Sequence, residues 1–189
     1  MLIAVLLIIL AAGSRLLALQ VPVLGNFSPL MALAFCGGVY FRNRWMWLVP
    51  FVALAASDLY INHTYATEYH YFWSARGAGV RLLCFAAGLA LGRLVAGRRS
   101  WTTLAGGALA ASLVFYFVTN TDSWLGDAGY SHSAAGWWQA ITIGHPQFPS
   151  TLYFFRNTLA SDLLFTAVFA LTMEYLARRR GEESLLASR

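Results

Sequence analysis

Charged side chains inside apolar stretches are the residues of this sequence that can do chemistry. Measured from the basic turn or tail beside each stretch, Asp58, Arg81 and Asp162 lie roughly 20–26 Å deep at about 1.5 Å per residue. Arg15 and Asn26 fall at a similar depth. The sequence therefore predicts one layer of two acids, two bases and an asparagine.

A charge near the middle of a membrane costs at least about 2.5–3.5 kcal/mol, so these side chains should face the protein interior and pair. One interpretation is that ion pairs hold the helices in register. The other, which we favour because the layer coincides with a polar break in the chain, is a binding site for a polar solute. The predicted binding residues are Asn26, Phe27, Ser28, Asp58, Tyr60, Arg81, Arg156, Asn157 and Asp162.

Other chemistry has little support in the sequence. No serine–histidine, cysteine–histidine or phosphate-loop arrangement is present, so we expect no enzyme and no cofactor. The four histidines lack the compact spacing of metal ligands; they are His63, His70, His132 and His145. Cys36 and Cys84 lie in separate apolar runs, where a packing role is expected and a disulfide is not.

Composition places the chain among polytopic membrane proteins. It is 59% hydrophobic and 11% charged over 189 residues. All 13 basic residues are arginine, and most of them lie in turns or tails beside apolar runs. The net charge of +5 is therefore a topology signal rather than a sign of nucleic-acid binding.

The apolar runs predict an all-α fold with six transmembrane helices. The segments are about Leu2–Val21, Pro29–Phe41, Trp45–Ile61, Gly77–Ala96, Thr102–Val118 and Thr151–Leu176. A kink is expected at Pro50. Basic turns follow every second segment, which predicts that both termini are cytoplasmic in a bacterial inner membrane. We expect one transmembrane domain, 1–177, and a basic cytoplasmic tail, 178–189.

The second segment is the element around which the others are arranged. Its 13 residues would be about 20 Å long, against about 30 Å of hydrocarbon. Ser28 before Pro29 is a good helix start, so the preceding residues 26–28 should lie below the outer surface and line a cavity. Two loops, 62–76 and 119–150, are expected outside. Within the second loop, Ala134–Gly144 is expected to be an interfacial helix, a lid over the outer face, or a loop that rests on the lipid headgroups.

Two short patterns are more specific. Ala-Ser-Asp-Leu occurs at Ala56–Leu59 and Ala160–Leu163, as an inverted repeat would require. The string N-F-S-P-x-x-A-L-A-x-x-G-G-x-Y-F from Asn26, followed by S-D-L and N-T-L-A-S-D-L, resembles an uncharacterised family of small bacterial membrane proteins. That family in turn resembles the substrate-binding S components of energy-coupling-factor vitamin transporters, over about Asn26 to Leu176.

The resemblance implies capture of a vitamin-like nutrient from the outer side, and a transmembrane coupling partner with ATPases. S components usually present an Ala-x-x-x-Ala face on the first helix for that partner, a spacing that Ala4, Ala11 and Ala12 do not give. A solitary importer is a variant, in which Cys84 would be the ligand for cobalamin. From the residues themselves, two alternatives stay open. They are a membrane-embedded enzyme acting on a lipid or isoprenoid, with Asp58 and His63 as an acid–base pair, and a structural or assembly subunit.

Overall fold

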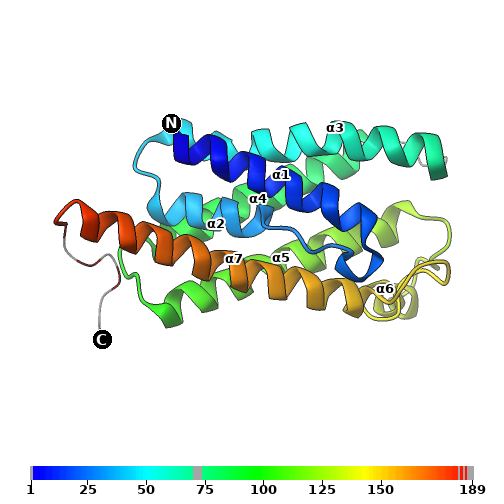
Figure 1. The fold of residues 1–189 in the computed structure, drawn as a ribbon. Helices are drawn as coiled ribbons and strands as arrows, with labels where there is room; N and C mark the ends of the chain where they lie inside the picture. The colour runs from blue at the N-terminus through cyan, green and yellow to red at the C-terminus, as the bar shows by residue number, and fades with distance from the viewer. Residues whose placement is uncertain (1, 70–73, 183, 185, 187–189) are drawn as a thin grey trace.

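The computed structural model describes residues 2–69, 74–182, 184 and 186, and within those ranges its regular secondary structure consists of helices joined by turns and loops. The long helices run back and forth along one bundle (Figure 1). They are α1 Leu2–Gln20, α3 Val49–Tyr69, α4 Ala75–Val95, α5 Trp101–Gly126 and α7 Thr151–Arg179. The shorter elements are α2 Leu30–Tyr40, α6 Ala134–Ile141, and the 3₁₀ turns η1 Pro22–Leu24 and η2 Arg44–Leu48.

Among the described residues, four stretches of helix are long and apolar enough to cross a membrane. They are 44–64, Ala75–Val95, Trp101–Gly126 and Thr151–Arg179. Large apolar side chains point away from the bundle, among them Leu59, Leu83 and Leu94 with 76%, 70% and 79% of their surface exposed. Exposed apolar patches of this extent mark a surface that water does not cover, so these helices indicate a membrane protein. The further crossings at α1 and α2 stay predictions.

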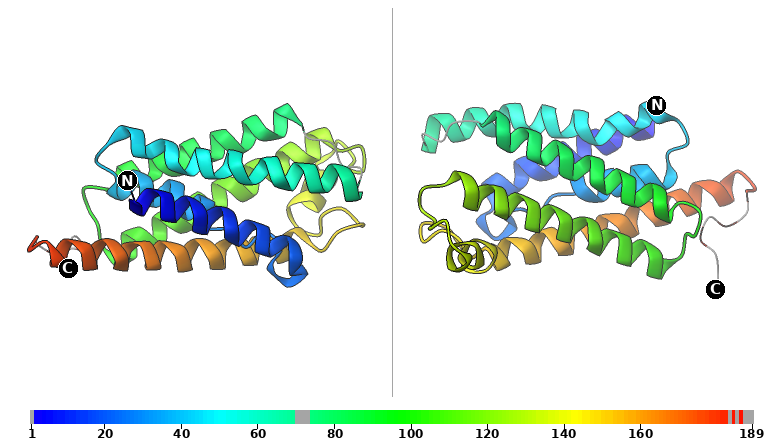
Figure 2. Two further views of the ribbon diagram at one scale, coloured as in Figure 1. Left: turned by 45° about the horizontal axis from the view of Figure 1, so that its top comes forward. Right: turned by 180° about the vertical axis from the view of Figure 1, so that it is seen from behind.

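The two ends of the bundle differ in charge. The turns at 41–44 and 96–100 and the last turns of α7 gather at one end, the left in Figure 1, which we call the basic end. At the opposite end α6 lies across the last turns of α5 and the first turns of α7 (Figure 2). We call this the cavity end, for the reason given below.

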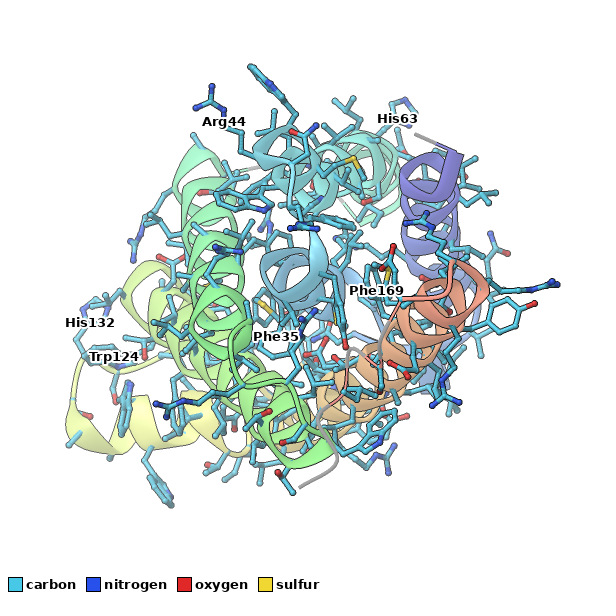
Figure 3. The ribbon with its side chains drawn as sticks, turned by 90° about the vertical axis from the view of Figure 1, so that its left-hand side faces the viewer. Phe35, Arg44, His63, Trp124, His132 and Phe169 are labelled. Atoms are coloured by element: carbon cyan, nitrogen blue, oxygen red, sulfur yellow. The ribbon has the colours of Figure 1, made fainter. Side chains whose placement is uncertain are left out.

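Helix α2 occupies the centre of the bundle, but only in the half nearer the basic end (Figures 1 and 3). All of its 11 residues are buried, because α3, α4, α5 and α7 surround it. Its closest neighbour is α4, whose Gly88 and Gly92 lie against Met31 and Phe35. The small-residue motif of α4 thus permits the close contact that keeps α2 at the centre.

The helix limits correct the sequence-based segments in three places. Pro50 lies in the first turn of α3, where its missing N–H costs nothing, so it starts the helix instead of kinking it. Helix α3 continues to Tyr69 and α5 to Gly126, so most of the first predicted outer loop and the start of the second are helical. The predicted helix within Ala134–Gly144 is confirmed as α6.

Candidate functional site

A cavity of about 920 Å³ opens at the cavity end, between α1, α4, α5 and the start of α7. Its size is within the range of pockets that hold small organic molecules. Of the nine residues predicted to bind a substrate, Asn26 and Arg81 are among the described residues that line it. The other lining side chains include Arg15, which was predicted only as a member of the charged layer.

Asp58 is the centre of a charged triad behind one wall of the cavity. Its Oδ1 accepts from Arg15 Nη1 at 2.7 Å, and its Oδ2 accepts from Arg81 Nη2 at 3.2 Å. Arg15 also donates to the hydroxyl of Ser57. The three side chains come from α3, α1 and α4, so a single carboxylate joins three helices.

The triad carries more positive than negative charge. Two guanidinium groups share one carboxylate, which leaves one formal positive charge on the wall formed by α1 and α4. Arg81 Nε is buried and has no hydrogen-bond partner within the described ranges. Guanidinium groups bind carboxylates and phosphates through paired N–H donors, so this wall suits an anionic group.

Aromatic rings form much of the remaining surface. Phe115, Tyr116, Phe154 and Phe155 line the cavity from α5 and α7. The hydroxyl of Tyr116 donates to the carbonyl of Ile141 and so fixes its ring against the end of α6. These rings offer apolar and π surface opposite the arginines, which suits a flat organic body.

The mouth of the cavity is polar and is formed by the first turn of α4, the last turns of α5 and the loops on either side of α6. Arg76 Nε lies 2.6 Å from Asp122 Oδ1, which joins the first turn of α4 to α5. His145 stacks edge-on against Tyr130, with ring centroids 5.9 Å apart. Burial, followed by the charge of Asp127, raises the pKa of Tyr130. Its hydroxyl therefore stays protonated at neutral pH and is available as a donor at the mouth.

The floor of the cavity is the break before α2, and α7 holds this break in place. Asn157 Nδ2 donates to the carbonyls of Val23 and Gly25 at 2.8 and 2.9 Å. Ser161 Oγ accepts from Ser28 N–H and donates to Ser28 C=O, at 3.2 and 2.9 Å. These side chains satisfy backbone groups that no helix can satisfy, which is why irregular backbone can lie inside the bundle. Asn157 is thus a support of the break, away from the cavity surface.

Asn26 occupies the one position of the break where the backbone turns sharply. Its φ is +61°, a left-handed conformation that asparagine tolerates better than most residues. Its carbonyl accepts from Thr158 Oγ1 at 3.3 Å, and Thr158 also lines the cavity. The turn lets the chain return from the cavity end and start α2 near the middle of the bundle.

Asp162 lies apart from the triad, which corrects the expectation that two acids and two bases form two ion pairs. Its Oδ1 accepts from Ala32 N–H at 3.1 Å, and its Oδ2 is 2.6 Å from Ser112 Oγ. No salt bridge to Asp162 occurs within the described ranges, and its side chain is 1% exposed. Equal depth in the sequence did not reveal that Asp58 and Asp162 face different neighbours.

The remaining predicted residues are not among the described residues that line the cavity. Tyr60 is 54% exposed on the outside of α3. The guanidinium of Arg156 lies 4.5 Å from the ring centroid of Tyr153 at the bundle surface. Phe27 packs edge-on against Phe165, and Ser28 Oγ accepts from Leu30 N–H at 3.4 Å, as a helix start requires.

Sequence reasoning missed the contribution of α5 to the site. Tyr116, Thr119, Asn120 and Ser123 all line the cavity. They recur at intervals of three and four residues, the period of one face of an α-helix. This spacing was the available signal, but the stretch had been assigned to an outer loop from residue 119 onward.

The cysteines and histidines take varied positions. Cys36 and Cys84 are free and belong to the hydrophobic core, in agreement with a packing role. His63 is exposed, and the two oxygens of the Asp58 carboxylate accept from arginines. His70 lies outside the described residues. Within the described chain, no group of three or more His, Cys, Asp or Glu side chains could hold a metal ion.

Comparison with known proteins identifies a family to which most of the chain is matched. The profile of a family described as "Family of unknown function (DUF6580)" matches residues 1–184. No curated protein and no solved structure matches the chain.

Proposed function

The chain belongs to the DUF6580 family. We propose that it captures a small, water-soluble, anionic nutrient for uptake across a bacterial cytoplasmic membrane. The observation that carries the proposal is the cavity of about 920 Å³ with Arg15 and Arg81 on one wall. In this role the cavity end faces the outside and the basic end faces the cytoplasm, as the positive-inside rule predicts.

The chemistry of the wall narrows the class of solute. Arg15 and Arg81 share Asp58, so a bound carboxylate or phosphate would supply the second negative charge. Rings of Phe115 and Phe155 would contact a heterocyclic or aromatic body. This description suits vitamin-like compounds, in line with the resemblance to S components. Transport, the coupling partner and the inner-membrane location belong to the same proposal.

A specific observation weighs against the membrane-enzyme alternative. Both oxygens of the Asp58 carboxylate, its proposed acid–base group, accept from guanidinium groups, and His63, the other member of the proposed pair, is exposed. The assembly-subunit alternative explains the triad but gives no role to a cavity of this size.

Arg81→Gln should weaken binding of the natural solute by more than tenfold while the protein still folds, because the Arg15–Asp58 pair remains. The solute is first identified by mass spectrometry of small molecules released from protein purified in mild detergent, and affinity is then measured by calorimetry. Arg44→Gln is the matched control, since Arg44 is an exposed arginine in η2 at the basic end, away from the cavity. Loss of affinity in the control alone would place the site elsewhere, and release of a lipid only would favour the enzyme.

Single cysteines at Arg98 and His132, in a background without Cys36 and Cys84, should label from opposite sides of the membrane. Both positions are exposed, one at the basic end and one at the cavity end. An impermeant maleimide added to intact cells should modify only the cysteine at 132, and a permeant maleimide should modify both. Labelling at 98 but not at 132 would reverse the proposed orientation.

A further inference from the structure

Asp162 has an environment opposite to that of Asp58. It is 1% exposed, and the two groups that contact its oxygens are the uncharged Ala32 N–H and Ser112 hydroxyl. Ala32 lies in the first turn of α2, where the helix dipole favours a negative charge. That effect is small beside the cost of burying a carboxylate without a cation. Of the described titratable side chains, Cys36 of α2 faces Asp162, and α5 presents Ser112.

The contacts of the Ser112 hydroxyl bear on whether Asp162 carries a proton. Its hydroxyl lies 3.0 Å from the carbonyl of Ala108 and 2.6 Å from Asp162 Oδ2. A serine hydroxyl has one hydrogen, and it can donate to only one of these oxygens. Both contacts are hydrogen bonds if Ser112 donates to Ala108 and a protonated Asp162 donates to Ser112. A neutral carboxylic acid is thus compatible with every contact of this buried group, whereas a carboxylate that accepts from Ser112 takes the single hydroxyl hydrogen away from Ala108.

The position of Asp162 along the bundle connects a proton on its carboxyl group with the cavity. Thr158 and Tyr116, which line the cavity, each lie one helical turn from Asp162 and Ser112 on the same two helices. Towards the basic end, Thr166 lies one helical turn beyond Asp162 on α7, and Cys36 lies one turn beyond Ala32 on α2. These two side chains are next to each other. The hydroxyl of Thr166 is buried next to the Cys36 thiol, and the hydroxyl of Tyr40 is buried without a hydrogen-bond partner in the described part of the chain. Asp162 thus lies between the floor of the cavity and a series of buried polar side chains.

We infer that Asp162 is a proton-binding site directly below the cavity, and that the proton is a second ligand whose movement is linked to that of the solute. In the loaded state the O–H bond of Asp162 is intact and donates to Ser112. On release the proton passes to water or a hydroxyl towards the basic end, and the carboxylate keeps the Ala32 N–H as a donor. Ala32 lies in the first turn of α2, the helix that follows the break, so the charge of Asp162 acts close to the segment that forms the cavity floor. The linkage to solute rests on the proposed function, whereas the protonation does not.

The test is infrared spectroscopy of the full-length protein in lipid nanodiscs. At neutral pH the wild-type protein should show the C=O stretch of a protonated carboxylic acid, and Asp162→Asn should lose it. Asp58→Asn is the matched control and should keep the band, because Asp162 and both groups that contact it are unchanged in this variant. Ser112→Ala, in which Asp162 is unchanged, should shift the band by removing its hydrogen-bond acceptor.

Three results would overturn the site. They are absence of the band in the wild-type protein, a band that survives in Asp162→Asn, and a band that Ser112→Ala leaves unmoved. If Asp162→Asn does not fold, the Ser112→Ala shift decides alone. A failure of the proposed function can be told apart from a failure of the proton site. If only the proposed function is wrong, Arg81→Gln leaves the solute affinity unchanged while the infrared band of Asp162 is still present. The linkage fails if addition of the copurified solute neither shifts nor removes the band.

Discussion

Asp58→Ala is expected to lower the free energy of unfolding by about 3 kcal/mol, since removing one partner of a buried ion pair leaves an uncompensated charge. Here two charges are left, because Arg15 and Arg81 both bind this carboxylate. Its side chain is 14% exposed, so water can offset little of the loss. Unfolding by detergent titration in mixed micelles, followed by circular dichroism, measures the effect.

Single removal of either arginine should cost less than removal of the acid. Arg81→Ala leaves the 2.7 Å pair of Arg15 and Asp58, and Arg15→Ala leaves the 3.2 Å pair of Arg81 and Asp58. A double-mutant cycle should therefore show coupling of Asp58 to both arginines. Asp122→Ala is the matched control, since it breaks an ion pair whose Arg76 is 51% exposed and should cost less than about 1 kcal/mol. Equal losses for the two acids would show that the cavity solvates the triad fully.

Gly92→Ala should prevent α2 from reaching its place at the centre of the bundle. A Cβ at residue 92 would lie 2.0 Å from the carbonyl oxygen of Phe35. That atom belongs to the backbone of α2, so rotation of a side chain cannot relieve the clash. The two helices must move apart. Overpacking of cores typically costs about 1–3 kcal/mol, and a backbone clash in a fully buried helix belongs at or above the upper end. We expect little folded protein in size-exclusion chromatography and a lower unfolding midpoint in what remains.

Gly79→Ala on the same helix provides the control for this prediction. A Cβ there meets nothing within 4 Å, and glycine in a helix interior is less favourable than alanine by about 1 kcal/mol. Gly79→Ala should therefore leave stability unchanged or raise it slightly. If Gly92→Ala behaved in the same way, α2 and α4 could not be as close as described.

Apolar runs were sufficient to locate the long helices, but the ends of α3 and α5 could not be predicted from them. Both helices continue for about two turns into polar sequence, to Tyr69 and Gly126. Hydropathy reports where a helix leaves an apolar environment, whereas hydrogen bonding along the backbone decides where it ends. The break before α2 was predictable, because Ser28-Pro29 and the short run that follows are local signals.

The sequence predicted the depth of the site residues in the membrane, but not which of them are in contact. Distance along a helix brought Arg15, Asp58 and Arg81 to one level, and the structure joins them in one triad. The direction in which a side chain points depends on how each helix is rotated about its axis. Depth along the helix gives no information on that rotation. For this reason Asp162 was grouped with the triad, although its partners are Ala32 and Ser112.

The way α7 holds the break has a consequence for how the protein is made. The bonds from Asn157 and Ser161 reach back across more than 130 residues to Val23, Gly25 and Ser28. While the ribosome is still adding the middle of the chain, these partners do not exist, and the break exposes unsatisfied peptide groups. A helix of 11 residues is too short to insert alone in a bilayer about 30 Å thick. Helix α2 should therefore enter the bundle only after synthesis of the last helix, so that chains truncated before residue 151 remain incompletely inserted and are substrates for membrane proteases.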